Sequence, residues 1–434
     1  MTIGIDLSSL QGAHRMRGIG YTLLNLLNNI SAEDRHKYLF VFYTYPYGAN
    51  ENPLDLLDLK GLNYEVRELR HRRHVRKRLP GRLGLLTSAA NQLIELRDLW
   101  LGDSRITDLK GVEFFLQTDQ SQHLPRRKRG LKTGLVIYDI IPYVLEWEYM
   151  WSYQTARRHG FSSKAALRVH ARRWLYAHKI KVNTDQASKL FAISEHTKQD
   201  FIKYLAVREN KIKVTPLGIN LPSASSAEGF ALQRYVKTSW GYIRQDFTLD
   251  PKLPFILYVG GADKRRRLTD LVAAFNLLRA QGEDFRLVLA GDTMQGPDNI
   301  ANEEVQHALK TSSYKDDIIF MGFVDDRTRD YLYSHALVFV FPSRYEGFGL
   351  PVLEAMSYGT PVISYDNAAV REVAGSCPVY VNNLLELADA MKKYLSYDAK
   401  DLKSERSKNV AQANKWRWRK TSQQILAAIS GNEA

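Results

Sequence analysis

Residues 341–356 read FPSRYEGFGLPVLEAM, and this stretch decides the fold class. The apolar run that ends at Phe341 predicts a strand. The two glycines that follow predict a loop, and Pro351 predicts the first turn of a helix that begins near Leu350. A helix N-terminus at the carboxyl end of a parallel strand is a ready anion site, because its first amides have no partner inside the helix.

Two carboxylates and two glycines make this stretch more specific than an ordinary strand–helix turn. Gly347 and Gly349 let a backbone approach a phosphate or a sugar without an intervening Cβ. Glu354 has only apolar neighbours in sequence, and an ionised carboxylate there is costly to bury unless hydroxyls or cations satisfy it. Ribose hydroxyls would satisfy it. The alternative is a plain turn with Glu354 in water.

Strands alternate with helices on both sides of this stretch, which predicts parallel sheets covered on both faces. We expect two doubly wound domains, residues 1–217 and 218–415, with a hinge near Pro216–Asn220. A last helix, about 416–434, follows the second series and could pack back on the first domain. The expected strands are 3–7, 38–43, 112–117, 134–138, 190–193 and 211–215, then 255–259, 285–290, 317–321, 337–341 and 360–364. The expected helices are 21–30, 194–205, 269–281 and 303–311; Gly18-Ile-Gly20 is expected as a loop.

Length, composition and charge exclude several classes of protein. The chain has 434 residues, of which 44% are hydrophobic and 25% charged, so it is globular rather than disordered. A single cysteine, Cys377, excludes an internal disulfide and a cysteine-based zinc cluster, and indicates a reducing compartment. The N-terminus has no signal-peptide pattern, and no apolar run is long enough to span a membrane.

The net charge of +14 lies entirely in the first half of the chain. Residues 1–217 hold 35 Lys and Arg against 21 Asp and Glu, whereas residues 218–434 hold 26 of each. This asymmetry indicates that one domain meets an anionic surface.

The EGFGLPVLEAM string, with Glu346 and Glu354 separated by seven residues, resembles the E-x7-E motif of the family 4 retaining glycosyltransferases. Proteins of that family have the GT-B fold: two Rossmann-like domains with a nucleotide-sugar donor in the cleft between them and no obligatory metal. Further blocks resemble the family, so that the match covers most of the chain and is weakest between about 45 and 110. These blocks are 192–200 (AISEHTKQD), 214–220 (VTPLGIN), 256–275 (ILYVGGADKRRRLTDLVAAF), 319–324 (IFMGFV) and 371–375 (REVAG).

The resemblance implies roles for the basic turn Lys264–Arg267. In the family an Arg followed by a Lys contacts the donor diphosphate, and Arg265 and Arg266 stand at those places here. Arginine in place of lysine keeps the charge but replaces a point charge with a planar fork. A shift of one residue within the turn, and a simple solvated basic turn, both stay open. Four cations here would repel one another unless an anion lay among them.

The resemblance also implies contacts for the other candidate residues. Glu346 would orient the donor sugar, Glu354 would accept hydrogen bonds from the ribose, and the amides of Gly347, Phe348, Gly349 and Leu350 would help to bind the donor. Gly18 and Gly20 stand at the family's glycine loop after the first strand.

The segment 136–142 (VIYDIIP) resembles the block in which a His-Asp pair begins a loop near the reacting sugar. Tyr138 stands in place of the histidine, which weakens any catalytic role for it, because a phenol is a poorer acid–base at neutral pH. Asp139 fits the pattern and is a candidate catalytic residue as a donor- or acceptor-sugar contact.

A basic stretch adjoins an amphipathic pattern in the first half. Arg70–Arg82 holds seven Lys and Arg, two His and no acid, and Leu83–Trp100 has apolar residues at helical intervals. This combination is typical of a surface that meets an anionic membrane. The alternative is a helix packed on its own domain beside a solvated loop. Nucleic acid is not expected, because no aromatic residue interleaves the basic run.

The sequence therefore predicts a retaining glycosyltransferase of the α/β GT-B class, mannosyltransferase-like, that is cytoplasmic and could lie on the inner face of the membrane. The donor would be GDP-mannose or a UDP-sugar, and the acceptor a hydroxyl of a glycan or lipid-linked glycan. No cofactor and no metal are expected, since the histidines show no metal-ligand spacing. Two alternatives stay open: a GT-B phosphorylase or sugar-nucleotide epimerase, and a non-catalytic protein on this scaffold that binds membranes or anionic polymers.

Overall fold

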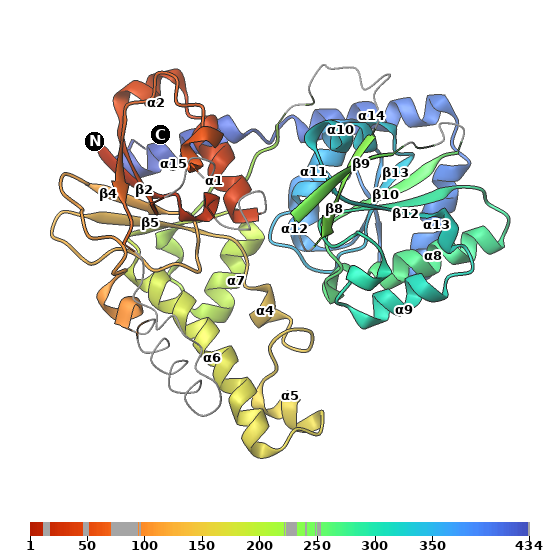
Figure 1. The fold of residues 1–434 in the computed structure, drawn as a ribbon, viewed down its shortest axis with the longest axis horizontal. Helices are drawn as coiled ribbons and strands as arrows, with labels where there is room; N and C mark the ends of the chain where they lie inside the picture. The colour runs from red at the N-terminus through yellow and green to blue at the C-terminus, as the bar shows by residue number, and fades with distance from the viewer. Residues whose placement is uncertain are drawn as a thin grey trace. The chain divides into compact units, whose positions relative to one another are not determined.

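The chain folds into two compact units in the computed structural model shown in Figure 1. The structure describes residues 1–11, 18–46, 52–70, 94, 97–220, 222, 232–238, 241–247, 249 and 253–432. The first unit comprises residues 1–218 together with 418–434, and the second comprises 219–417. The sequence analysis placed the boundary between residues 217 and 218, whereas this division lies between 218 and 219.

The first unit contains a seven-stranded sheet in which every neighbouring pair of strands is parallel. Its order is β3-β2-β1-β4-β5-β6-β7. The central strands are buried along most of their length, as expected of parallel strands with helices on both faces. The strands are β1 (Thr2–Asp6), β2 (Leu39–Thr44), β3 (Tyr64–Glu68), β4 (Phe114–Gln117), β5 (Lys132–Ile137), β6 (Lys189–Ala192) and β7 (Ile212–Val214).

The helices of the first unit include one that comes from the far end of the chain. This C-terminal helix, α15, packs against α1: the ring centroids of Trp418 and Tyr21 are 6.1 Å apart, and Ser422 Oγ donates to the carbonyl oxygen of Leu26 at 2.7 Å. The α-helices are α1 (Gly18–Asn28), α2 (Ala32–Lys37), α4 (Ile141–Val144), α5 (Tyr153–Arg158), α6 (Ser163–Gln186), α7 (Glu195–Leu205) and α15 (Trp418–Ser430), with short 3-10 helices η1 (Ser8–Leu10), η2 (Pro53–Leu56) and η3 (Glu209–Lys211).

The second unit contains an eight-stranded sheet of order β15-β14-β13-β10-β11-β12-β8-β9. Six strands run parallel, and the β8–β9 hairpin adds an antiparallel edge next to β12. The strands are β8 (Leu232–Thr238), β9 (Gly241–Phe247), β10 (Phe255–Val259), β11 (Arg286–Ala290), β12 (Ile318–Val324), β13 (Val338–Phe341), β14 (Val362–Tyr365) and β15 (Val379–Val381).

Helices and one large apolar core complete the second unit. Its α-helices are α8 (Leu268–Ala280), α9 (Glu303–Thr311), α10 (Asp326–His335), α11 (Leu350–Ser357), α12 (Ala368–Ala374), α13 (Leu384–Leu395) and α14 (Ala399–Ala413), with 3-10 helices η4 (Lys264–Arg266), η5 (Pro297–Asn299) and η6 (Lys315–Asp317).

Each sheet reverses its strand order at one point, between β1 and β4 in the first unit and between β10 and β13 in the second. Loops that leave the carboxyl ends of such a pair diverge to opposite faces and leave a crevice, where open α/β sheets bind their ligands. The candidate residues Arg265 and Arg266 follow β10, and Glu346 follows β13. The fold therefore places them at the switch point of the second unit.

Most predicted elements are confirmed within one or two residues at each end, and β10 and α9 have the predicted bounds. One prediction is wrong: Gly18 and Gly20 lie in the first turn of α1 rather than in a loop before it. The sequence analysis missed β3, β15, the β8–β9 hairpin and the 24-residue helix α6.

Candidate functional site

The basic turn after β10 separates its four cations into two inner and two outer residues. Arg265 and Arg266, whose side chains are 12% and 17% exposed, both reach Glu346. Lys264 is exposed and lies 4.0 Å from Glu304, and Arg267 pairs with Asp270 at 3.1 Å. The turn is therefore not a uniformly solvated one.

Glu346 receives three groups on a single carboxylate oxygen. Arg265 Nη1 donates to Glu346 Oε1 at 2.5 Å, Ser343 Oγ donates to it at 2.8 Å, and Arg266 Nε lies 3.5 Å away. The backbone joins the two loops as well, because the Arg344 amide donates to the carbonyl of Arg265 at 2.9 Å. Two guanidinium groups thus share one carboxylate.

Arg266 is enclosed by its own turn and by Tyr258 at the end of β10. A Cβ at Gly260 would lie 2.3 Å from Arg266 Nη1, so the approach of the guanidinium requires glycine there. Burial lowers the pKa of Arg266, but nearby Tyr258 and Glu346 more than offset it, and the net shift is upward. Burial raises the pKa of Tyr258, whose hydroxyl donates to the Gly261 carbonyl at 2.6 Å. Arg266 therefore stays charged beside a neutral phenol.

The Nε of Arg266 is buried and makes no hydrogen bond with any described residue. A buried donor without a partner is costly, so it marks a place where a ligand or water completes the structure.

The loop after β13 turns into α11 at Gly349, whose φ of +111° explains the glycine. Gly347, Phe348 and Gly349 are buried, and the Phe348 ring lies 5.8 Å from the ring of Trp416. Leu350 is the first residue of α11, so the positive end of the helix dipole lies at this loop.

Glu354 lies one turn into α11, beside α10. Tyr333 OH donates to Glu354 Oε2 at 3.2 Å. Burial raises the pKa of Glu354, although nearby Arg329 and the Tyr333 hydrogen bond oppose the shift. Burial also raises the pKa of Tyr333 well above its ordinary value. Burial therefore disfavours the ionised carboxylate, and Arg329 and Tyr333 offset this only in part.

In the first unit, Asp139 and Tyr138 follow the carboxyl end of β5. Asp139 Oδ1 accepts from the Ile141 amide at 3.1 Å, at the start of α4, and its carbonyl accepts from Gln120 Nε2 at 2.7 Å. Burial raises the pKa of Tyr138 far above its ordinary value, and a contact with the Thr22 side chain opposes this shift only in part. Burial thus disfavours ionisation of Tyr138 near neutral pH.

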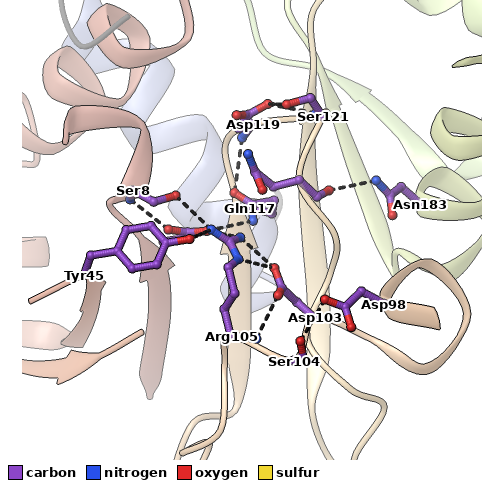
Figure 2. A network of polar contacts seen from close by, with 12 residues as sticks. Ser8, Tyr45, Asp98, Asp103, Ser104, Arg105, Gln117, Asp119, Ser121 and Asn183 are labelled. Atoms are coloured by element: carbon purple, nitrogen blue, oxygen red, sulfur yellow. Dashed lines mark hydrogen bonds and ion pairs between the residues drawn. The ribbon is translucent and has the colours of Figure 1, made fainter. Parts of the chain in front are cut away.

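The switch point of the first unit holds a buried ion network (Figure 2). Arg105 donates to Asp6 at 3.0 Å and to Asp103 at 2.6 Å, and all three side chains are at most 2% exposed. Ser8, Tyr45 and Gln117 complete the network: Arg105 donates to the first two hydroxyls, and Gln117 donates to Asp6.

The described residues contain no group of three or more His, Cys, Asp or Glu side chains arranged to hold a metal ion. None of the helices they form is both long and apolar enough to cross a membrane. The basic stretch Arg70–Arg82 lies outside the described residues apart from Arg70, and Leu83–Trp100 lies outside them apart from residues 94 and 97–100.

Comparison with known proteins identifies the second unit. Residues 242–415 match the family described as glycosyl transferases group 1. This part of the chain is thus similar to the group 1 glycosyltransferases. The phosphorylase, epimerase and non-catalytic alternatives are not favoured by the matches.

Curated proteins similar to this chain include two from Escherichia coli. The O-antigen chain mannosyltransferase B is 26% identical over 56% of this chain and 61% of its own length. The serotype-specific mannosyltransferase WbdA is 28% identical over 55% of this chain and 28% of its own length. The chain thus spans less than two thirds of these relatives.

Solved structures share the fold of this chain along its whole length. WaaG, a glycosyltransferase involved in lipopolysaccharide biosynthesis, has a TM-score of 0.60 and is 13% identical, with 99% of this chain and 100% of WaaG covered. Anabaena HepE in complex with UDP and glucose has a TM-score of 0.59 and is 15% identical, with 99% of both chains covered. The fold is GT-B, with two Rossmann-like domains.

Sequence reasoning missed several residues that support the site of the group 1 domain. Ser343 stands three residues before Glu346, a spacing at which a hydroxyl in a tight turn reaches back to a carboxylate, so it could have been found. Tyr258 and Tyr333 act through tertiary packing, which no local pattern reveals.

Proposed function

We propose that the chain is a glycosyltransferase that moves a sugar from a nucleotide diphosphate-sugar to a hydroxyl of a glycan or lipid-linked glycan. The observation that carries this proposal is the convergence of Arg265 and Arg266 on Glu346 at the switch point of the group 1 domain. Arg266 also lies 3.9 Å from the half-exposed Asp263. Two guanidinium groups that converge on one site suit a diphosphate, because each can donate to phosphate oxygens.

In this proposal Arg265 and Arg266 neutralise the diphosphate as it leaves, which stabilises the transition state electrostatically. The first amides of α11 and the loop residues Gly347, Phe348, Gly349 and Leu350 add to this effect. Two observations support these roles. Arg266 Nε makes no hydrogen bond with the described residues, and α11 begins at the end of the loop that holds Glu346.

Glu346 would orient the donor sugar and Glu354 would accept hydrogen bonds from the ribose. From the first unit, Asp139 would contact a sugar, and Gly18 and Gly20 at the start of α1 would contribute to donor binding. Retention of the anomeric configuration follows from the family resemblance. We propose a same-face route assisted by the leaving group, without a metal, because no carboxylate stands out as a covalent nucleophile.

GDP-mannose is the first donor to test, because the relatives are mannosyltransferases by description, and UDP-sugars are next. We further propose a cytoplasmic protein that works on the inner face of a membrane in polysaccharide biosynthesis, with Arg70–Arg82 and Leu83–Trp100 as a membrane surface. The lipopolysaccharide and O-antigen roles named for the relatives support that setting.

The test is a thermal-shift panel of GDP, UDP, ADP and their sugar conjugates on the protein and on Arg266→Ala. A ligand that binds only the folded state raises the melting temperature. We expect one nucleotide family to stabilise the protein, and Arg266→Ala to weaken its binding by about tenfold to a hundredfold, the range for a hydrogen bond to a charged group. The matched control is Lys264→Ala, since Lys264 points away from Glu346.

Donor turnover and product analysis complete the test. The stabilising donor should transfer its sugar to a glycan acceptor, and proton NMR of the product should show the anomeric configuration of the donor. No stabilisation by any nucleotide, or equal binding by Arg266→Ala and the protein, would overturn the proposal.

A further inference from the structure

The segment between Tyr149 and Thr184 is a long basic part of the described chain without an acid. It contains eight Lys and Arg and no Asp or Glu. It forms α5 and most of α6, and we call residues 147–179 the α5–α6 arm. In Figure 1 (yellow) α5 and the N-terminal half of α6 extend away from the strands of the first unit.

The same arm gathers exposed apolar side chains. Of the fourteen large hydrophobic residues that are exposed among those described, six lie in it, and Trp147 and Trp174 are each 55% exposed. A contiguous apolar patch of this kind on a soluble surface marks an interaction site. The six are Trp147, Tyr153, Phe161, Leu167, Trp174 and Leu175.

The helical positions in α6 sort these residues into faces. Ala166 and Ile180 are buried, and Ile180 belongs to the core of the first unit. Leu167, Ala171 and Trp174 follow at intervals of four and three residues and share one exposed face. The apolar face is thus separate from the face that packs on the protein.

Cations flank this apolar face on its exposed side. Lys164, Arg168 and Arg172 follow at intervals of four residues, and all three are exposed. Trp174 stacks on His178 with ring centroids 4.6 Å apart, and the exposed Trp100 ring lies 5.7 Å from His178. The patch therefore continues onto Trp100 beyond the arm.

The tip of the arm is held in one shape by aromatic contacts. The Trp151 ring stacks on His159 at 4.5 Å and meets Phe161 at 5.3 Å, and the Trp147 ring lies 5.6 Å from His159. Trp151 Nε1 donates to the Trp147 carbonyl at 2.9 Å. An exposed aromatic group that is already rigid loses little entropy when it meets a partner.

We propose that the α5–α6 arm docks on an anionic lipid bilayer. Tryptophan and tyrosine prefer the interface of a bilayer, where an apolar ring and a polar edge are both satisfied. Lys164, Arg168 and Arg172 lie where they would meet lipid phosphates, and Glu148, at the start of the arm, is its one acid. This surface is distinct from Arg70–Arg82, and its role does not depend on the proposed reaction.

The experiment is co-sedimentation of the full chain with vesicles of phosphatidylcholine alone and of equimolar phosphatidylcholine and phosphatidylglycerol. We expect binding to the anionic vesicles, weaker binding at high salt, and little binding to phosphatidylcholine. Arg168→Glu with Arg172→Glu should reduce the partition coefficient by about thirtyfold or more, at about fivefold for each cation removed from the surface. Leu167→Ser with Leu175→Ser should also reduce it.

Matched controls exist in the second unit. Lys403→Glu with Lys408→Glu makes the same change in net charge on exposed positions of α14, and Leu385→Ser removes another exposed leucine. These variants should bind vesicles as the protein does. Melting temperatures of all variants should agree, because none of the exchanged side chains is buried.

Several results would overturn the proposal. These are equal binding to both kinds of vesicle, loss of binding in the α14 control to the same degree, or unchanged binding in the arm variant. Sedimentation that shows a dimer dispersed by the arm variant, with no vesicle binding, would assign the patch to a second copy. Binding of single-stranded nucleic acid in place of vesicles would assign it to that polymer.

Discussion

The two switch points combine arginines and carboxylates differently. In the first unit one guanidinium, Arg105, lies between two buried carboxylates. In the second unit two guanidinium groups share Glu346 and remain partly exposed, and Arg266 also lies 3.9 Å from the half-exposed Asp263. The first network is closed by protein groups, whereas the second is partly open to solvent, and Arg266 Nε makes no hydrogen bond with the described residues.

The difference teaches that the same residue types serve two purposes. A buried network that is fully satisfied fixes the geometry of the loops around it. Guanidinium groups that stay partly exposed can still meet an anionic ligand. The exposure of the guanidinium groups, more than the presence of arginine, therefore separates the structural cluster from the candidate binding cluster.

The largest expected effect is on the closed network. Arg105→Met leaves Asp6 and Asp103 buried without a cation, and should lower the free energy of unfolding by about 3–5 kcal/mol. Urea denaturation and hydrogen exchange of the first unit measure this. The control is Arg67→Met, which removes surface ion pairs to Glu65 and Asp108 and should cost about 1 kcal/mol or less. Equal losses in the two variants would contradict the comparison.

A smaller effect is expected when the second cluster loses the carboxylate that its two arginines share. Glu346→Gln removes a counter-charge from both Arg265 and Arg266 and leaves Arg266 with Asp263 at 3.9 Å, so a free nucleoside diphosphate should bind about tenfold more tightly at low salt. Sugar transfer should fall, because the donor sugar loses its contact. Calorimetry with GDP and UDP measures the first effect, with Glu304→Gln as the control. Weaker binding of the free nucleotide would show that Glu346 does not compete with phosphate.

Glu354 should make stability depend on pH. Because its folded pKa is raised, the folded state holds the proton that the unfolded chain has already released. Its contribution to stability is therefore present at acid pH and lost as pH rises through the folded pKa. Glu354→Gln should be more stable than the protein at neutral pH, and this advantage should vanish near about pH 4. Urea midpoints across this range test it; a constant difference would refute it.

The smallest effect is expected for Tyr138 in the first unit. Its buried hydroxyl makes at most a weak contact with the Thr22 side chain, so Tyr138→Phe should change stability by no more than about 1 kcal/mol and leave transfer unchanged. Melting temperature and initial rates measure both. A tenfold loss of rate with an unchanged melting temperature would give the hydroxyl a catalytic role.

The sequence predicted the elements whose side chains are apolar throughout or strongly periodic. FILYV at β10 and VFVF at β13 are buried parallel strands, and Ser194 caps α7 as predicted by accepting from the Thr197 amide. The edge strand β3 was missed because YEVRE is largely exposed and weakly apolar. Helix α6 was missed because few of its residues are buried, so its sequence shows little apolar periodicity.

The candidate site also has residues that the sequence predicted and residues that only the structure revealed. Arg265, Arg266 and Glu346 come from two loops 80 residues apart in the sequence, and the motif resemblance pointed to all three. The structure adds that Lys264 and Arg267 turn elsewhere, a distinction that depends on the backbone of η4. The Asp6–Arg105–Asp103 network was not foreseeable, because tertiary folding alone brings residue 105 beside residue 6.

The position of α15 at the end of the chain affects folding during synthesis. Trp418 is buried in the first unit beside α1, yet it follows all 199 residues of the second unit in the chain. At ribosomal speeds of 5–20 residues per second, roughly 10–40 s separate the synthesis of Gly218 from that of Trp418. During that interval the first unit lacks α15, so the apolar side of α1 that α15 covers is exposed, while the second unit can already fold. The residues synthesised last complete the unit whose synthesis began first. Premature termination would therefore destabilise the N-terminal unit.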